Sequence, residues 1–387
     1  MRYTQFIELV EDGAPPQELE PHLSDPDFDI NSKFPRGDTP LFVAISVDSP
    51  LEVIDLLLAC PRIKPDNVGR GELTCLALAC YLGLTDIVRR LLNHPAVDPT
   101  FISPRGSAIF AAACAEHSGP LALLLADGRA HPGAHQSANG ATTVVPLVVA
   151  TTCNRVDSVK LLLADPRVDV TAAGDQGFDA FISGCGVGDT EVLEIFLEDG
   201  RANVNSTQFE NATGLYLAAQ AGRLDTLHTL MAYCGNLDTS TRIQSNTDPM
   251  ENGKNAIEWV ETILGEHHQA NIPMEDYERA IKNGREVISL ITQYDTDRRQ
   301  TRANIQALPV FKTKFVPRIY ALVVLFSDNY LHAEKAPPEV FRFLRIASSL
   351  PLELQMVLCR RVFGDARDVI TSELAEGAFK WALSVTK

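Results

Sequence analysis

Between residues 39 and 231 a short pattern recurs six times, and this repeat constrains the fold more than any other feature of the sequence. Each occurrence has an apolar anchor, a small residue three positions later, and a bulky apolar pair 15 and 16 positions after the anchor. Successive anchors lie 35, 33, 38, 34 and 34 residues apart, whereas the internal offset of 16 never varies. Insertions therefore fall between units, as expected for rigid helix pairs joined by tolerant loops. The anchors are Leu41, Leu76, Ile109, Leu147, Phe181 and Leu215, and the small residues are Ala44, Ala79, Ala112, Ala150, Gly184 and Ala218.

The two conserved offsets indicate a pair of helices in each unit. The small residue lies in the first helix, where close packing on neighbouring units leaves no room for a larger side chain. The second helix carries an apolar stripe at helical spacing, such as Val53, Ile54, Leu57 and Leu58. One pair cannot bury that stripe alone, so the sequence predicts an all-α solenoid in which stacked units share a continuous core.

Three segments show the pattern most clearly: Gly37-Asp38-Thr39-Pro40-Leu41, the stretch 76–83, and Asp157 to Leu163. They resemble the ankyrin repeat, whose pattern is Gly-x-Thr-Pro-Leu-His-x-Ala-Ala followed by Gly and a Leu-rich helix. This resemblance implies an ankyrin-repeat solenoid of helix-turn-helix units with short β-hairpin loops, a fold that binds other proteins. One departure is that the family's His after the anchor is replaced by Phe42, Ala77, Phe110, Val148, Ile182 and Tyr216, which predicts looser turns.

The units end in a recurring tail, and tails and caps set the expected domain boundaries. Tails such as Pro166-Arg167-Val168-Asp169 and Gly200-Arg201-Ala202-Asn203 stop the second helix and lead into the next unit. Residues 3–31 are predicted to form an N-terminal cap, which places the array with its cap at 1–240. A degenerate repeat or helical extension is expected at 241–294, starting near Asn252 to Ile257 with a second helix from Tyr277 to Tyr294. A basic linker at 295–318 and a C-terminal helical module at 319–387 complete the division.

The C-terminal module contains the segment Leu350-Pro351-Leu352-Glu353-Leu354-Gln355-Met356-Val357-Leu358. It resembles the start of an F-box-like domain, such as the C-terminal module of poxvirus-type ankyrin proteins. The resemblance implies binding to the adaptor of a cullin-type ubiquitin ligase, with the array selecting the target. The possible adaptor-binding residues are Leu350, Pro351, Leu352, Leu354 and Val357. The alternative is a helical cap that closes the array, in which these apolar residues are simply core.

Charge bears on the kind of partner. The formal net charge is -16, and residues 1–250 hold 32 acidic and 16 basic side chains, so the excess lies with the array. An acidic array repels phosphate backbones, which argues against a nucleic-acid partner and favours a protein partner with a basic surface. The alternative is that the charge serves only solubility.

Targeting signals and membrane segments were sought in the same way. The N-terminus has no signal-peptide pattern, and the longest apolar run, Ile319 to Phe326, is far below the ~20 residues of a bilayer span. The eight cysteines lack metal-ligand spacing and suit a reducing compartment. We therefore expect no membrane association and a cytoplasmic location. The basic residues of 295–318 also allow a nuclear-localisation signal, the alternative being a solvated linker.

Catalytic and cofactor signatures were also sought. The run Gly184 to Gly188 lacks the Lys-Ser/Thr of a phosphate loop and falls in phase with the repeat. His117, His131 and His135 lie near Cys114, but their spacing fits no zinc pattern. The sequence thus predicts no enzyme activity, no cofactor and no metal.

The binding residues are expected on the hairpin tips and on the concave face of the helices. Aromatic and Arg side chains are the usual hot spots of protein interfaces. On the tips these are Phe34, Arg36, Arg70, Phe101, Arg105 and Phe209. On the concave face, the candidate binding residues lie five residues after the anchors and include Tyr81, Thr152 and Gln220. The alternative for the three tip Phe residues is that they fold back onto the array.

Overall fold

The computed structural model describes residues 2–25, 27–33, 37–133, 135–136, 143–174, 177–207, 209–245, 250–266, 274–311, 314–315 and 318. The chain divides into two compact units, one of Met1–Thr229 with Asp238–Val287 and one of Leu230–Leu237 with Ile288–Lys387. None of the helices in the described ranges has the length and apolar character that a bilayer span requires.

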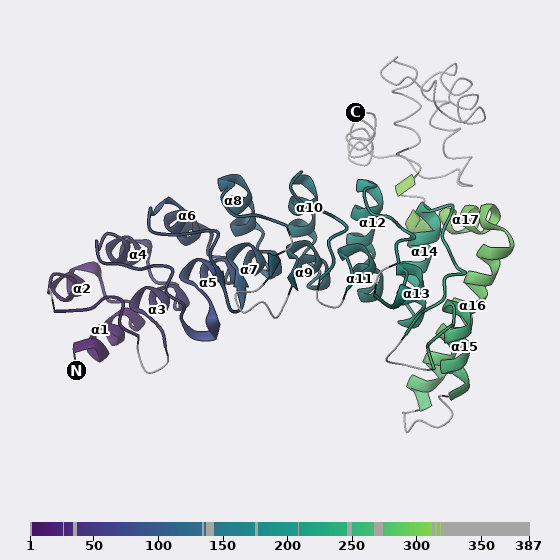
Figure 1. Cartoon of the computed structure of the whole chain (residues 1–387), viewed down its shortest axis with the longest axis horizontal. Coiled ribbons are helices and arrows are strands. Elements are labelled where there is room, and N and C mark those ends of the chain that lie inside the picture. The colour runs from purple at the N-terminus through teal and green to yellow at the C-terminus, as the bar shows by residue number, and fades with distance from the viewer. Residues whose placement is uncertain are drawn as a thin grey trace, which may run out of the picture. The chain divides into compact units, whose positions relative to one another are not determined.

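The first unit is a series of helix pairs, and its first helices lie side by side in one row while the second helices form another (Figure 1). We call these the first-helix row and the second-helix row. An N-terminal pair, α1 (Arg2–Glu11) and α2 (Pro16–Leu23), precedes six further pairs. These are α3 (Pro40–Ser46) with α4 (Leu51–Leu58), α5 (Cys75–Tyr81) with α6 (Thr85–Asn93), α7 (Ala108–Cys114) with α8 (Gly119–Asp127), α9 (Pro146–Thr152) with α10 (Val156–Ala164), α11 (Ala180–Val187) with α12 (Thr190–Asp199), and α13 (Gly214–Gln220) with α14 (Leu224–Tyr233), the last turn of which belongs to the second unit.

The first helices begin where a side chain caps the helix. The side chain of the residue two before the anchor accepts a hydrogen bond from the backbone N–H three residues later, which satisfies one of the free amides at a helix start. Thr74 accepts from Ala77 in this way, and Asp179 accepts from Ile182. The same cap occurs at Thr39, Ser107 and Thr213, whereas Val145 makes no side-chain cap. The turn thus keeps a hydrogen-bonded support although the family's His is absent.

The two sequence offsets mark the buried core, as predicted. The small residues of the first helices, Ala44, Ala79, Ala112, Ala150 and Ala218, have no exposed surface. A Cβ added at Gly184, which takes this position in α11, would lie 3.1 Å from Thr151 Cγ2 of the preceding unit. The second helices bury their stripe, including Leu57, Leu91, Leu124, Leu162 and Phe196. Close packing between first helices therefore sets the size of that residue.

Short hairpins and turns connect the units. Strands β1 (Ile102–Ser103) and β2 (Gly106–Ser107) pair antiparallel, with Ile102 opposite Ser107. Strands β3 (His135–Gln136) and β4 (Thr143–Val144) do the same before α9. Single-turn 3-10 helices, η1 (Arg70–Glu72) and η2 (Phe209–Asn211), stand in the corresponding loops before α5 and α13. Among the described residues, the predicted hairpin loops thus occur before α7 and α9.

In the described part of the chain the six pairs are followed by α15 (Ala256–Glu266), α16 (Met274–Thr296) and α17 (Arg298–Gln306). Asn255 and Glu258 form a reciprocal cap at the start of α15, each side chain accepting from the other residue's backbone N–H. Helix α15 packs against α13 within the first unit. Helix α15 follows the expected start near Asn252 to Ile257, and α16 covers the expected second helix from Tyr277 to Tyr294. The boundaries at 240, 294 and 318 stay predictions, and the module at 319–387 lies outside the described residues.

Within the second unit, α17 caps the end of α14. Arg302 donates from Nε to the carbonyl of Ala232 at 2.9 Å and from Nη2 to that of Tyr233 at 3.1 Å. Gln306 donates to the Ala232 carbonyl at 2.7 Å. The buried Tyr294 hydroxyl donates to the Cys234 carbonyl and accepts from the Leu237 N–H. These bonds satisfy carbonyls that the helix itself leaves without a partner.

Candidate protein-binding surface

The residues predicted on the concave face lie at the C-terminal ends of the first helices. Tyr81 is the last residue of α5, Thr152 of α9 and Gln220 of α13, and all three are exposed. Thr152 Oγ1 donates to the Val149 carbonyl at 3.1 Å. Gln220 Nε2 donates to Glu251 Oε1 at 3.0 Å, and the Tyr216 hydroxyl donates to the same oxygen at 2.7 Å. Hydrogen bonds thus already orient two of the three side chains.

The predicted tip residues are placed only in part. Arg70 lies in η1 and Arg105 lies between β1 and β2, and both side chains are exposed. The Arg70 backbone N–H donates to Asp38 Oδ1 at 2.6 Å, which fixes this loop to the preceding one. Phe101 is 38% exposed, so its ring is not folded into the core.

The remaining predicted residues are not described. Phe34 and Arg36 lie outside the described residues, as do the adaptor-binding candidates Leu350, Pro351, Leu352, Leu354 and Val357. The backbone of Phe209 is part of η2, but its side chain is outside the description.

One set of exposed apolar residues was missed in the sequence. It lies six residues after the anchor, one position beyond those chosen, where Val47 is 43% exposed, Leu82 41% and Val187 36%. With Tyr81, at 56%, these are four of the eight strongly exposed large hydrophobic side chains in the described part of the chain. Their regular spacing could have revealed them. We define the first-helix edge as the exposed residues at these two positions: Ser46, Val47, Tyr81, Leu82, Thr152, Cys153, Val187, Gln220 and Ala221.

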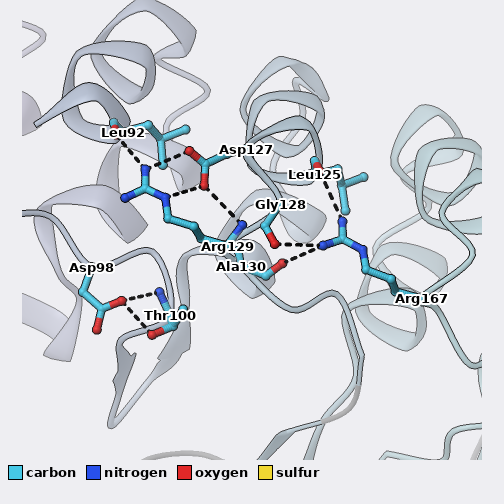
Figure 2. A network of polar contacts seen from close by, with 9 residues as sticks. All are labelled: Leu92, Asp98, Thr100, Leu125, Asp127, Gly128, Arg129, Ala130 and Arg167. Atoms are coloured by element: carbon cyan, nitrogen blue, oxygen red, sulfur yellow. Dashed lines mark hydrogen bonds and ion pairs between the residues drawn. The ribbon is translucent and has the colours of Figure 1, made fainter. Parts of the chain in front are cut away.

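The unit tails supply a second recurring device, in which an arginine bridges neighbouring units (Figure 2). Arg129 pairs with Asp127 through Nε and Nη2, at 2.7 and 2.8 Å, and Nη2 also donates to the carbonyl of Leu92 in the preceding unit at 2.7 Å. The hydrogen bond and charge of Arg129 lower the pKa of Asp127 below its ordinary value. The aspartate therefore holds the guanidinium in place to cap the C-terminal end of α6.

Arg167 repeats this arrangement one unit later. It pairs with Asp165, and the hydrogen bond from Arg167 lowers the pKa of that carboxyl. Its guanidinium also donates to the carbonyls of Leu125 at 3.2 Å and Gly128 at 3.1 Å, at the end of α8 (Figure 2). The equivalent bonds run from Arg201 to Leu163, from Arg62 to Leu23, and from His94 to Leu58. Each of these five tails thus caps the second helix of the unit before it.

Asx turns form a further link between tails. Asp98 accepts from the backbone N–H and the hydroxyl of Thr100 at 2.9 and 2.6 Å, and these bonds lower its pKa. The backbone N–H of Asp98 in turn donates to Asp66 of the preceding unit at 3.0 Å. Asn31 accepts from Lys64 and Asn205 from Asp238 in the same manner. The polar side chains of the tails therefore serve stacking, which leaves the first-helix edge as the better candidate for binding.

Residues suited to metal or redox chemistry have structural surroundings. In the part of the chain that the structure describes, no group of three His, Cys, Asp or Glu could hold a metal ion. His131 Nδ1 accepts from the Gly133 N–H at 3.0 Å. The seven cysteines of the described ranges are free, and burial raises the pKa of Cys75 to about 12. Such thiols remain protonated and act as apolar core.

Comparison with known proteins supports the fold. No protein-family model matches the sequence, and no curated protein does. The chain is similar to the crystal structure of the human ASB11 ankyrin repeat domain, with a TM-score of 0.50 and 22% identity over 60% of this chain and 99% of that one. It is also similar to the ankyrin repeat domain of Bcl-3, a member of the IkappaB protein family, with a TM-score of 0.46 and 24% identity over 56% of this chain and 95% of that one.

The similarity to the ASB11 domain supports the architecture. The helical array has the fold of ankyrin repeat domains, so the predicted fold class is confirmed. The matches do not identify a partner.

Proposed function

We propose that this chain is a non-catalytic scaffold whose array binds a partner protein through the first-helix edge and the hairpin tips. The supporting observation is the recurrence of exposed apolar side chains on the edge, with Val47, Leu82 and Val187 at the equivalent position of three different units and Tyr81 next to Leu82. Apolar side chains exposed at a recurring position differ from the scattered exposure of ordinary surfaces, and they mark interaction sites. Tyr and Arg, which Tyr81, Arg70 and Arg105 provide here, are the residue types that carry most binding energy in interfaces.

A capture experiment with the full chain tests this function. Cell proteins retained by the wild type are compared with those retained by Tyr81→Ala with Leu82→Ser. We expect the variant to lose its specific partners, because truncating central apolar contacts typically costs about 2 kcal/mol or more per hot-spot residue.

The matched control is Leu308→Ser, which changes a similarly exposed hydrophobic residue outside the edge. This variant should retain the partners, and urea midpoints should show that both proteins are folded. An edge variant that retains the same partners as the wild type would refute binding at this edge.

A second candidate function is substrate recognition for a cullin-type ubiquitin ligase. It rests on the resemblance of the segment from Leu350 to Leu358 to the start of an F-box-like domain. An apolar helix face starting at Leu350 and Pro351 would dock in a groove of the adaptor. The test is a pull-down of the cullin adaptor with the wild type and with Leu350→Ala plus Pro351→Ala. No adaptor in the wild-type pull-down would exclude this role, and deletion of 340–387 should leave partner binding by the array intact.

We further infer that the protein acts in the cytoplasm, with entry to the nucleus depending on the basic residues of 295–318. A fluorescent fusion of the full chain should be cytoplasmic. If it is nuclear, substitution of Arg298, Arg299 and Arg302 should return it to the cytoplasm.

A further inference from the structure

An exposed acidic side chain stands beside the first-helix edge in five of the units. It is the second residue of the second helix in each case: Glu52, Asp86, Asp157, Glu191 and Asp225. We call these five residues the acidic row. Short turns separate them from the edge, so that Asp157 lies only four residues beyond Cys153 and Glu191 only four beyond Val187. Edge residues and an acidic residue therefore follow one another closely in these five units, whereas the unit of α7 and α8 has the buried Ala115 and Pro120 at the corresponding positions.

The basic side chains near the edge and the acidic row are largely engaged with the protein itself. Arg155 donates from Nε to the Cys114 carbonyl at 3.0 Å, and Arg223 packs over Gly188. Lys160 lies 3.7 Å from Glu191 across an exposed surface, which is a weak pairing. Arg90 pairs in the same loose way with Asp55 rather than with the acidic row. The acidic row thus keeps a negative potential that an array of net charge -16 reinforces.

We propose that the first-helix edge and the acidic row together bind a basic amphipathic helix of the partner protein. This proposal rests on the proposed scaffold function and specifies the partner segment. A helix can present an apolar stripe and an adjacent basic stripe to one surface, because its side chains project at about 100° intervals. An extended strand sends alternate side chains to opposite faces and presents one line only.

The stacking of the units also sets the spacing in the bound helix. Packed helices lie about 8–10 Å apart, and an α-helix rises about 1.5 Å per residue. A helix lying along the array therefore meets a new unit about every five to seven residues. Three consecutive units, with Asp157, Glu191 and Asp225, would bind a helix of about 20 residues whose Lys or Arg recur at that spacing.

The test measures binding of labelled peptides to the full-length protein by fluorescence anisotropy. The probe is a peptide of about 20 residues with a Leu stripe and an adjacent Lys stripe at this spacing. Its comparisons are the same peptide with Glu for Lys and a peptide of identical composition in shuffled order. We expect the basic helix to bind at least about tenfold more tightly than either, and more weakly as salt rises.

Variants of the protein test whether the peptide binds at the edge and the acidic row. Asp157→Asn with Glu191→Gln and Asp225→Asn should weaken binding about tenfold and remove most of its salt dependence. Val187→Ser should weaken binding without changing the salt dependence. The control removes the same charge elsewhere, with Glu8→Gln, Glu11→Gln and Glu18→Gln in the exposed cap, and should bind as the wild type does.

A charge reversal guards against variants that simply fail to fold. Asp157→Lys with Glu191→Lys and Asp225→Lys should gain binding to the acidic peptide, which an unfolded protein would not show selectively over the shuffled peptide. The proposal is overturned if the basic helix does not bind, or if the shuffled or acidic peptide binds the wild type as tightly as the basic helix does. It is also overturned if the cap variant loses as much affinity for the basic helix as the acidic-row variant does. If partner capture depends on Tyr81 and Leu82 but not on the acidic row, the scaffold function stands and the basic-helix proposal fails.

Discussion

Replacing Arg167 by Met tests whether the tail arginines hold neighbouring units together. Arg167→Met keeps most of the apolar stem and removes every donor of the guanidinium. The lost bonds are those to the carbonyls of Leu125 at 3.2 Å, Gly128 at 3.1 Å and Ala130 at 3.5 Å, together with the pairing to Asp165. Since these carbonyls belong to the preceding unit, the substitution weakens the contact between units and leaves both helix pairs unchanged.

The expected loss is modest because the site is partly open to water. A net hydrogen bond contributes about 1 kcal/mol, and the bond at 3.5 Å adds little. The Arg167 side chain is 34% exposed, so water replaces part of what is lost. We therefore expect the free energy of unfolding to fall by about 1.5–2 kcal/mol, which lowers the thermal midpoint by about 3–8 °C for a domain of this size. Because stacked units depend on nearest-neighbour contacts, the transition should also broaden.

The assay is urea unfolding followed by circular dichroism, with Arg90→Met as the matched control. Arg90 lies 3.5 Å from Asp55, and the two side chains are 49% and 43% exposed, so this pair should contribute about 0–0.5 kcal/mol. If both variants shift the urea midpoint equally, the carbonyl contacts of Arg167 do not stabilise the array and the reasoning is wrong.

Three further predictions concern pH, a glycine and the end of α14. Arg167 lowers the pKa of Asp165 in the folded state. The stability that this carboxylate provides is therefore present above about pH 4 and is lost as the pH falls through the pKa of the folded state. Acid should consequently lower the urea midpoint less in Arg167→Met than in the wild type. Gly188→Ala should lower the urea midpoint more than Gly222→Ala. Both glycines have positive φ, but only the Cβ added at 188 would meet a neighbour, Arg223 Cδ at 2.6 Å. Equal midpoints for the two variants would contradict this. Arg302→Ala should speed hydrogen exchange in the last turn of α14 and not in α5, which unchanged exchange would disprove.

The repeat made the helix pairs predictable because burial imposes it at every unit. Ala44 and Leu57 occupy positions where size and apolar character are both fixed by packing, and both are fully buried. The F-box-like segment at Leu350 has no such repeated context, so its role stays a prediction. The domain boundaries and the binding role of the selected surface residues also stay predictions.

Exposure at the ends of the first helices was harder to infer. Leu82 is 41% exposed, whereas Ala115 at the equivalent position is buried, so residue type and register alone do not decide it. The tail arginines were visible as a recurring residue, but their acceptors were not. Arg129 donates to a carbonyl 37 residues earlier, and a backbone carbonyl leaves no mark in the sequence. The Asp-x-Arg spacing was the available signal, and it identifies the pairing with Asp127 but not the unit that the pair supports.

The tail contacts have a direction that matters during synthesis. Each capped carbonyl is synthesised about 40 residues before the arginine that binds it. The pairs are Leu92 with Arg129, Leu125 with Arg167 and Leu163 with Arg201. A nascent array emerging from the ribosome would therefore always carry one helix end that its successor has yet to complete. Stalled or prematurely terminated chains would expose that end, whereas loss of the first pair would leave no such gap downstream. A quality-control factor that recognises incomplete chains would thus find the same feature, uncapped carbonyls at the end of a second helix, whichever unit was synthesised last.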